Sequence, residues 1–333
     1  MVNPSCIGYR DKPQEINLAG HRVIRRLLPI VLAWAALTGC AGRTDTTAVS
    51  PLIEGSLPHG GRTRSYFLLV PTSYQVGQPA PLVLALHGGG GDADRMCQLQ
   101  GGINELAEDE GFLVVCPQGV EQHWNDGRQT QRYRAHRESI DDVGFLLALI
   151  DHLAASYTLD LSRVYATGMS NGGMMSYRLA CEAGQRLAGV AAVIANLPAD
   201  LDCRPVSPIP VMIMNGTEDP LMPFDGGQVR FFRQELGEVL STAQTAEFWA
   251  EVNHCSPAPA PVPLPEQAPN DGTRIARQIY ADCDPAGRLV VYVVEGGGHS
   301  WPGGPQYAPR WVIGPSSREG HAGQAIWAFF GGD

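Results

Sequence analysis

The sequence predicts an α/β fold in a single domain, with a mostly parallel central sheet and helices on both faces. The first observation behind this prediction is size, because 333 residues that are 44% hydrophobic can bury one large core. The second is the alternation of short β-rich runs with helical patterns along the chain. The third is the content of 39 glycines and 26 prolines, which suits many tight turns between strands and helices.

The expected elements follow one another in the order strand, helix, strand that a parallel sheet requires. The expected strands, many of them bounded by Gly or Pro, cover residues 65–70, 81–86, 112–116, 163–167, 189–195, 210–215 and 289–294. The expected helices lie near residues 98–110, 139–156, 171–183, 242–252 and 321–330. A Pro- and Ala-rich stretch at 257–269 is expected to form an exposed loop. No internal repeat is found.

The helix expected near 139–156 begins with two adjacent carboxylates, Asp141 and Asp142. Ser139 precedes Asp142 by three residues, which is the spacing of a capping box, and we therefore expect a helix cap here. The alternative is a pair of catalytic carboxylates.

Charge composition argues against binding to nucleic acid. The chain has 24 Lys and Arg residues against 34 Asp and Glu residues, a formal net charge of −10, and Lys12 is its only lysine. Nucleic-acid binding requires a basic surface that neutralises phosphates. We therefore expect no nucleic-acid partner. No sequence pattern indicates an oligomeric state.

The N-terminal segment has the organisation of an export signal. Arg22, Arg25 and Arg26 precede an apolar run at 27–37, which is too short to span a bilayer but suits the apolar part of a signal peptide. The run ends in Leu-Thr-Gly-Cys at 37–40, which resembles the lipobox of bacterial lipoproteins, where the chain is cut before the cysteine and its thiol is acylated. The alternative is a buried N-terminal helix with an incidental Cys40.

These patterns predict a signal peptide at 1–39, a tether at 40–55 and a catalytic domain at 56–333. Residues 1–20 have no role in such a signal, so either the start codon is assigned too far upstream or the basic region is extended. We expect an exported protein, either a cell-envelope lipoprotein or an extracellular one, that touches a membrane only through a lipid anchor at Cys40.

The remaining cysteines predict disulfides. Cys6 would leave with the signal peptide, and an even set of six stays in an oxidising compartment. We expect sequential pairing, because each bridge then closes a short loop: Cys97 with Cys116, Cys181 with Cys203, and Cys255 with Cys283. A metal site is the alternative, but no C-x-x-C or H-x-x-x-H spacing supports it, and we expect no metal.

The strongest local motif is Gly-Met-Ser-Asn-Gly at 168–172, directly after the strand expected at 163–167 and before a helical pattern. This context is typical of a nucleophile elbow, in which Ser170 sits on a strained turn from strand to helix. Strand and helix backbones crowd the positions two residues before and after the serine, and glycine leaves room for them. The alternative is a chance match in a glycine-rich chain.

A serine nucleophile needs a histidine base and a carboxylate that holds the imidazole in the correct tautomer. Asp219 follows the strand expected at 210–215, and it is preferred over its neighbours Glu218 and Asp225. His299 follows the strand expected at 289–294 and three glycines that let the loop bend back. These positions give the chain order Ser, acid, His of this type of site. The alternatives are a turn-forming Asp and a structural His.

A glycine-rich loop after the strand at 81–86 supplies candidate oxyanion donors. Backbone amides at such a turn stabilise the negative charge that develops on the substrate oxygen. We expect the amide of Asn171, together with that of Gly89 or Gly90, to form the oxyanion hole.

The same loop also satisfies a dinucleotide-binding pattern, G-x-G-x-x-A, through Gly88, Gly90 and Ala93. The strand expected at 112–116 has no acidic residue at its end to hold a ribose, which argues against this alternative.

Five motifs in this order resemble the polyhydroxybutyrate depolymerase family, whose exported members merge with feruloyl and acetylxylan esterases. The motifs are HGGGG at 87–91, WNDGR at 124–128, DDVGF at 141–145, GMSNGG at 168–173 and GHSWPG at 298–303. The resemblance implies an α/β-hydrolase fold and ester hydrolysis, with neither a metal nor an organic cofactor. It places the family's nucleophile on Ser170, its acid on Asp219 and its base on His299.

Two tryptophans within these motifs, Trp124 and Trp301, are candidates for an aromatic wall against the acyl or hydroxycinnamoyl group of a substrate. Ordinary core packing is the alternative for each.

The expected function is therefore an exported serine esterase that acts through an acyl-enzyme on polyhydroxybutyrate-type oligoesters or on hydroxycinnamoyl or short-acyl esters. Its partner would be the ester substrate, as a small molecule, oligoester or polymer. The alternatives are a serine peptidase on the same fold and a non-catalytic surface binding protein.

Overall fold

A computed structural model of the protein describes residues 51–331, which belong to one compact unit. Its strands are β1 (Ile53–His59), β2 (Arg62–Leu69), β3 (Ala80–Leu86), β4 (Leu113–Pro117), β5 (Leu159–Met169), β6 (Gly189–Val193), β7 (Val211–Gly216), β8 (Gly227–Phe231), β9 (Gln234–Val239), β10 (Val262–Pro263), β11 (Arg274–Ile279) and β12 (Leu289–Glu295). Its α-helices are α1 (Ala93–Cys97), α2 (Ala107–Glu110), α3 (Arg134–Arg137), α4 (Asp142–Ala154), α5 (Asn171–Ala183), α6 (Thr242–Val252), α7 (Arg310–Ile313) and α8 (Ala322–Phe330). Two 3₁₀ helices are η1 (Ile103–Leu106) and η2 (Gly184–Arg186).

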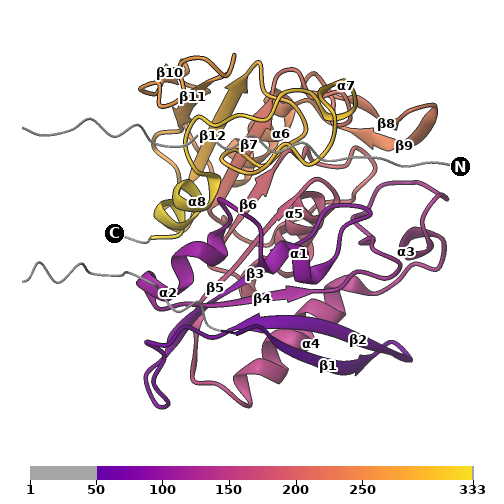
Figure 1. Ribbon diagram of the computed structural model, residues 1–333, viewed down its shortest axis with the longest axis vertical. Coiled ribbons are helices and arrows are strands. Elements are labelled where there is room, and N and C mark those ends of the chain that lie inside the picture. The colour runs from indigo at the N-terminus through magenta and orange to yellow at the C-terminus, as the bar shows by residue number, and fades with distance from the viewer. Residues whose placement is uncertain (1–50, 332–333) are drawn as a thin grey trace, which may run out of the picture. The chain divides into compact units, whose positions relative to one another are not determined.

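Ten of the strands form one sheet in the order β1-β2-β4-β3-β5-β6-β7-β12-β11-β10 (Figure 1). The six central strands, β4, β3, β5, β6, β7 and β12, are parallel to one another. The strands β1 and β2 at one edge and β10 and β11 at the other are added by antiparallel pairing. The predicted mostly parallel sheet is confirmed, and all seven predicted strands are present.

The core lies in two layers, one on each face of the sheet. Successive side chains of a strand point to opposite faces, and in β3 the leucines at 82, 84 and 86 join one layer while Val83 and Ala85 join the other. Helices α4, α5 and α6 cover the first face, and α1, α2 and α8 cover the second. Helices on both faces were predicted, and they explain why the central strands are nearly continuous runs of buried residues.

Five strands were not predicted. β1 begins at Ile53, so residues 53–55 belong to the sheet and not to the predicted tether. β1 joins β2 through Gly60 and Gly61, both with positive φ, a two-residue hairpin that a Gly-Gly signal can indicate. The β8–β9 hairpin forms a separate two-stranded sheet. These strands lie at edges or in a hairpin, where burial is partial and the hydrophobic pattern is weak.

The predicted capping box at Ser139 is wrong. Asp141 is the N-cap of α4, because its side chain accepts a hydrogen bond from the backbone amide of Gly144 at 2.8 Å. Asp142 is fully buried and forms an ion pair of 2.7 Å with Arg64. The two carboxylates therefore have separate structural roles and are not a catalytic pair. A capping box does occur at α6, where Ser241 caps the helix.

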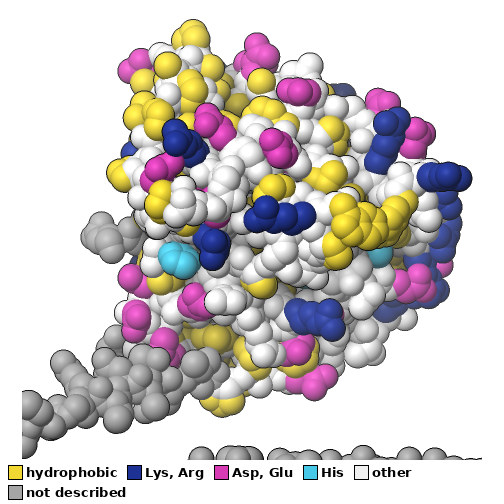
Figure 2. Space-filling model, turned by 45° about the horizontal axis from the view of Figure 1, so that its top comes forward, with side chains coloured by type: hydrophobic (Ala, Val, Ile, Leu, Met, Phe, Trp, Pro, Cys, Tyr) yellow, Lys and Arg dark blue, Asp and Glu magenta, His cyan; other side chains and the backbone are white. Residues whose placement is uncertain are grey.

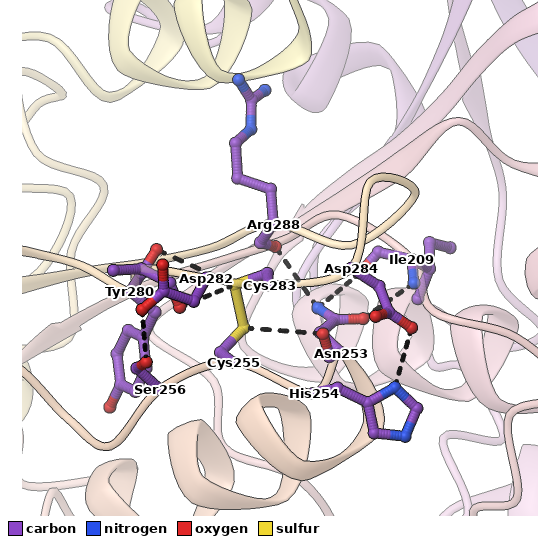
Figure 3. Close-up of a disulfide and its surroundings, with 11 residues drawn as sticks. Ile209, Asn253, His254, Cys255, Ser256, Tyr280, Asp282, Cys283, Asp284 and Arg288 are labelled. Atoms are coloured by element: carbon purple, nitrogen blue, oxygen red, sulfur yellow. Dashed lines mark hydrogen bonds and ion pairs between the residues drawn. A yellow bond between two sulfur atoms is a disulfide. The ribbon is translucent and has the colours of Figure 1, made fainter.

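The structure contains the three disulfides of the sequential pairing, Cys97–Cys116, Cys181–Cys203 and Cys255–Cys283. The third encloses the Pro-rich loop, and polar contacts hold its flanks (Figure 3). The side chain of Asn253 bonds both backbone groups of Ile209 at 2.9 and 2.8 Å, and His254 lies 2.8 Å from Asp284. Within residues 51–331, no helix is long and apolar enough to cross a membrane.

Candidate active site

Ser170 occupies the turn between β5 and α5. Its backbone has φ 54° and ψ −120°, a region that non-glycine residues adopt only when the surrounding structure imposes it. Its amide donates to the carbonyl oxygen of Val193 at 2.9 Å, and its own carbonyl oxygen accepts from Met174 at 2.9 Å. The neighbouring strand and the first turn of α5 thus hold the serine in the strained conformation that a nucleophile elbow requires.

The glycines of the motif are needed because backbone atoms lie where side chains would be. A Cβ added to Gly168 would lie 2.6 Å from the carbonyl carbon of Gly172 and 2.7 Å from the carbonyl oxygen of Leu86. A Cβ added to Gly172 would lie 2.2 Å from the same oxygen of Leu86. The structure therefore has the predicted backbone crowding at both positions.

The structure brings Ser170, His299 and Asp219 together. His299 Nε2 lies 2.9 Å from Ser170 Oγ, and His299 Nδ1 lies 2.7 Å from Asp219 Oδ2. An ionised carboxylate only accepts hydrogen bonds, so Nδ1 carries the proton and Nε2 is left to accept from the serine hydroxyl. The side chains of His299 and Asp219 are 6% and 2% exposed, which shields this chain of hydrogen bonds from water.

Asp219 is held in place by the turn that follows β7. Its Oδ1 accepts hydrogen bonds from the backbone amides of Leu221 and Met222, both at 2.8 Å, which leaves Oδ2 for His299. The neighbouring carboxylates Glu218 and Asp225 are exposed. Of the three candidate acids, Asp219 is therefore the one in contact with the imidazole.

The loop after β12 positions His299 against α7. The amide of His299 donates to the carbonyl oxygen of Ile313 at 2.5 Å, and the hydroxyl of Tyr307 donates to the carbonyl oxygen of His299 at 2.9 Å. A Cβ on Gly298 would lie 2.2 Å from the Ile313 oxygen, so the loop can approach α7 closely only with glycine there. Tyr307 belongs to no motif, so the sequence carries no signal for this contact.

The glycine-rich loop after β3 lies beside Ser170. A Cβ on Gly88 would lie 3.5 Å from the Cβ of Ser170, and one on Gly89 would lie 3.7 Å from the Cβ of Asn171. The amide of Gly90 donates to the carbonyl oxygen of Gln122 at 2.9 Å. The prediction of Gly90 as an oxyanion donor is therefore wrong, because its amide is already engaged. The amides of Gly89 and Asn171 have no hydrogen-bond acceptor among the described residues, and they remain the candidate oxyanion donors.

The side chain of His87 contacts this loop through its ring nitrogens. Its Nδ1 lies 2.8 Å from the carbonyl oxygen of Gly88, and its Nε2 accepts a hydrogen bond from the amide of Gly119 at 3.0 Å. These contacts fit a neutral ring with its proton on Nδ1. Burial lowers the pKa of His87 from its ordinary value to about 4, so the ring stays neutral at physiological pH.

His87 is expected to make the protein less stable in acid. Because the unfolded chain binds a proton near pH 6.5 and the folded one only near 4, stability falls as pH drops between these values, by about 2–3 kcal/mol. Urea unfolding of wild type and His87→Asn at pH 7 and pH 4.5 measures this contribution. The wild type should lose more of its free energy of unfolding than the variant does. An exposed control, His321→Asn, should follow the wild type, and equal losses in all three proteins would contradict the prediction.

The two candidate wall tryptophans have different positions. Trp124 is fully buried and its Nε1 donates to the carbonyl oxygen of His87 at 3.0 Å. It does not line the pocket, and its assignment as a substrate wall is corrected to core packing under the glycine loop. Trp301 is 2% exposed, and its Nε1 donates to the carbonyl oxygen of Gly101 at 2.9 Å. Unlike Trp124, it lines the pocket.

The pocket over Ser170 has a volume of about 580 Å³. Its walls are the glycine loop, Asp94 and Arg95 of α1 with Gln98 directly after that helix, and the aromatic residues Trp301 and Tyr307. A pocket of this size accommodates a small acyl or aromatic group together with part of an alcohol.

A group of exposed aromatic side chains lies over α7 and the β8–β9 hairpin (Figure 2). Phe231, Phe232 and Trp311 are 44%, 66% and 75% exposed. The ring of Phe232 lies 4.7 Å from that of Phe231 and 6.2 Å from that of Trp311. α7 also accepts a hydrogen bond from the backbone of His299. The exposed aromatic surface and the loop that contains His299 therefore both contact α7.

A serine, histidine and aspartate in this geometry, at the carboxyl ends of parallel strands, have the arrangement that a serine hydrolase site requires on an α/β-hydrolase fold. The family model described as Esterase PHB depolymerase matches residues 64–227. A putative esterase, NocK, of Nocardia uniformis subsp. tsuyamanensis is 35% identical over 268 residues, which cover 78% of this chain and 76% of that protein. The chain belongs to the esterase PHB depolymerase family and is a carboxylic ester hydrolase.

A more distant relative is also described as an esterase. A probable feruloyl esterase C of Aspergillus niger is 26% identical over 306 residues, which cover 90% of this chain and 96% of that protein. The solved structure of an acetyl xylan esterase from Aspergillus awamori superposes with a TM-score of 0.53 at 14% identity, over 84% of this chain and all of that one. At that identity the likeness shows the shared fold.

Proposed function

We propose that this protein is an exported serine esterase that cleaves carboxylic esters through an acyl-enzyme on Ser170. The observation that carries the proposal is the chain of contacts from Ser170 Oγ to His299 Nε2 at 2.9 Å and from His299 Nδ1 to Asp219 at 2.7 Å, at the base of an open pocket. A serine hydroxyl is a weak nucleophile, and this arrangement supplies the base that activates it.

The reaction follows from the geometry in two halves. His299 takes the proton of Ser170 as Oγ attacks the ester carbonyl carbon, and the resulting imidazolium then gives that proton to the departing alcohol. Water repeats the sequence on the acyl-enzyme, with His299 as base, and releases the acid and free Ser170. The amides of Gly89 and Asn171 stabilise the negative oxygen in both halves, and one such donor contributes about 10²–10³ in rate.

The proposed substrates are short-acyl or hydroxycinnamoyl esters and polyhydroxybutyrate-type oligoesters. Relatives described as feruloyl esterases support the aromatic class, and the family to which the chain belongs supports the oligoester class. The aromatic wall of Trp301 and Tyr307 suits a planar acyl group, and the polar residues of α1 suit an alcohol with hydroxyl groups.

Initial rates on p-nitrophenyl butyrate, methyl ferulate and amorphous polyhydroxybutyrate, with the Ser170→Ala variant as the blank, test the proposal. We expect hydrolysis of p-nitrophenyl butyrate and of at least one of the other two. Methyl ferulate turnover without clearing of the polymer assigns the hydroxycinnamoyl class, and clearing assigns the oligoester class. Absence of turnover on all three would contradict the proposal.

We also propose that the protein is exported and anchored by lipid at Cys40. The signal peptide at 1–39 and Cys40 lie outside the described residues, so the proposal rests on their sequence pattern. The three disulfides support it, because disulfides persist in oxidising compartments outside the cytosol.

The mature protein should therefore begin at Cys40, carry an acylated thiol there and have no free thiol on its other six cysteines. Intact mass measurement before and after alkylation under native and reducing conditions tests this. A Cys40→Ala variant serves as the control and should lack the lipid mass. An unmodified Cys40 in the native host would refute the anchor, and alkylation of all six cysteines without reductant would refute the bridges.

A further inference from the structure

Asn171, the residue after the nucleophile, has a side chain that is used entirely for hydrogen bonds inside the protein. It is 2% exposed. Its Oδ1 accepts from the amide of Trp124 at 2.8 Å, and its Nδ2 donates to the carbonyl oxygen of Trp124 at 3.0 Å and to Asp126 Oδ2 at 2.6 Å. With both amide hydrogens and the oxygen engaged, the side chain has one orientation.

Asp126 is the charged end of this arrangement. It is fully buried, and its carboxylate also accepts from the guanidinium of Arg128, at 2.8 Å from Nη2, and from His136 Nε2 at 2.9 Å. Burial alone would raise the pKa of Asp126, but the charge of Arg128 and the bond from His136 outweigh it and hold that pKa well below its usual range. The carboxylate is therefore ionised at neutral pH.

The mechanism described above does not use this carboxylate directly. Asp126 does not line the pocket over Ser170, and its contacts reach the site only through Asn171. A buried ion pair is not by itself a source of stability, because the loss of hydration offsets much of the attraction between the charges. The position of this ion pair, behind the residue whose backbone amide is a candidate oxyanion donor, indicates a role in the site.

The amide of Asn171 belongs to the peptide unit that joins it to Ser170. The strained ψ of Ser170, −120°, sets the direction in which that amide points. Strained conformations relax unless neighbouring contacts impose them. The three hydrogen bonds of the Asn171 side chain are contacts of this kind, and in the shortest of them Nδ2 donates to Asp126 at 2.6 Å.

We propose that Asp126 is a positioning residue of the oxyanion hole, which acts through the side chain of Asn171 to hold the backbone amide of Asn171 in its catalytic direction. This inference rests on the proposed function. Arg128 extends the arrangement, since its Nη1 donates to the carbonyl oxygen of Leu236 at 2.9 Å and so ties the β8–β9 hairpin to the same buried charge.

The test compares Asp126→Asn and Asn171→Ala with the wild type on p-nitrophenyl butyrate. One oxyanion donor is worth about 10²–10³ in kcat, and a donor that is displaced rather than lost should lower kcat by about 10-fold to 100-fold. KM should change less than 3-fold, because the pocket walls are untouched. The affinity for phenylboronic acid, whose tetrahedral adduct with serine carries a negative oxygen, should fall with kcat.

Asp142→Asn is the matched control. Asp142 is equally buried and equally paired with an arginine, Arg64, at 2.7 Å, and it accepts from the amide of Asn125 in the same segment of the chain. No hydrogen bond joins its side chain to that of Asn171. The melting temperature of this variant should fall by about as much as that of Asp126→Asn, but its kcat should stay within about 2-fold of the wild type.

A double-mutant cycle separates positioning from general destabilisation. If Asp126 acts through Asn171, the double variant Asp126→Asn/Asn171→Ala should have a kcat no lower than the worse single variant, because effects on one shared path do not add. Full additivity, or an equal loss of kcat in Asp142→Asn, would overturn the proposal. Should Asp126→Asn fail to fold, Asn171→Ala decides alone, and wild-type kcat in that variant would overturn it.

The outcome is distinguishable from failure of the proposed function. A wild type without esterase activity, or an active Ser170→Ala variant, would refute the esterase mechanism at Ser170. Activity that depends on Ser170 but is indifferent to Asp126 and Asn171 side chains would refute only the positioning role.

Discussion

Replacement of Ser170 by alanine is expected to lower kcat for ester hydrolysis by about 10⁴-fold or more while leaving the fold intact. The hydroxyl is the only group at this position that His299, 2.9 Å away, can deprotonate for attack on an ester. Initial rates on p-nitrophenyl butyrate, with melting temperature as the measure of folding, check both parts of the expectation.

The structure explains why the fold should tolerate this change. Alanine keeps the Cβ of serine, and the backbone hydrogen bonds of residue 170 to Val193 and Met174 do not involve the side chain. A variant that retains more than a few per cent of the wild-type rate would exclude Ser170 as the nucleophile.

Ser176 provides the matched control for this experiment. It is a fully buried serine on the same helix, and its hydroxyl donates to the carbonyl oxygen of Gly172 at 3.0 Å. Such a bond within a helix contributes little to stability. Ser176→Ala should therefore keep nearly full activity, and a loss comparable to that of Ser170→Ala would mean that the elbow is sensitive to any change in α5.

The elbow itself was predictable from sequence because its constraints are local. The strand before Ser170, the helix after it and the two glycines all lie within one continuous stretch, and each follows from backbone crowding at a single turn. The sequential disulfides were predictable for a similar reason, since each closes a loop of fewer than 30 residues.

The oxyanion loop was predictable only in part. Four consecutive glycines cannot be distinguished from one another in the sequence. The amide of Gly90 is excluded as an oxyanion donor only because it donates to the carbonyl oxygen of Gln122. That contact joins segments more than 30 residues apart. Trp124 shows the same limit, because tryptophan is common both in substrate walls and in cores. Only the packing of its ring against His87 identifies it as a core residue.

Residues that act through other residues left no signal of their own in the sequence. Tyr307 lies in a loop without a motif and bonds a backbone oxygen, a role that many side chains could fill. Asp126 lies in a motif that the family resemblance already contained, but its contact with Asn171 crosses 45 residues and becomes visible only in the folded chain.

Replacement of Asp219 by asparagine is expected to lower kcat by about 10⁴-fold, through the tautomer of His299 rather than through its position. Oδ1 of residue 219 accepts from two backbone amides, those of Leu221 and Met222. In the variant this position must still be an acceptor, so the asparagine oxygen occupies it. The NH₂ group then faces His299 Nδ1.

A donor opposite Nδ1 requires that nitrogen to accept, which moves the ring proton to Nε2. His299 Nε2 then donates toward Ser170 Oγ instead of accepting its proton, and the serine is not activated. KM should stay close to the wild-type value, because Asp219 does not line the pocket. Steady-state kinetics on p-nitrophenyl butyrate measure the separation of kcat from KM.

Two neighbouring carboxylates provide the controls that distinguish this role from a general effect of charge. Glu218→Gln and Asp225→Asn each remove one negative charge from the same loop, and both side chains are exposed. Each variant should keep kcat within about 2-fold of the wild type, because solvent screens the charge of an exposed carboxylate. A large loss of kcat in either control would assign the role of the triad acid to a different residue. More than about 1% of wild-type kcat in Asp219→Asn would do the same, because a His299 tautomer that cannot accept the serine proton leaves no comparable route to catalysis.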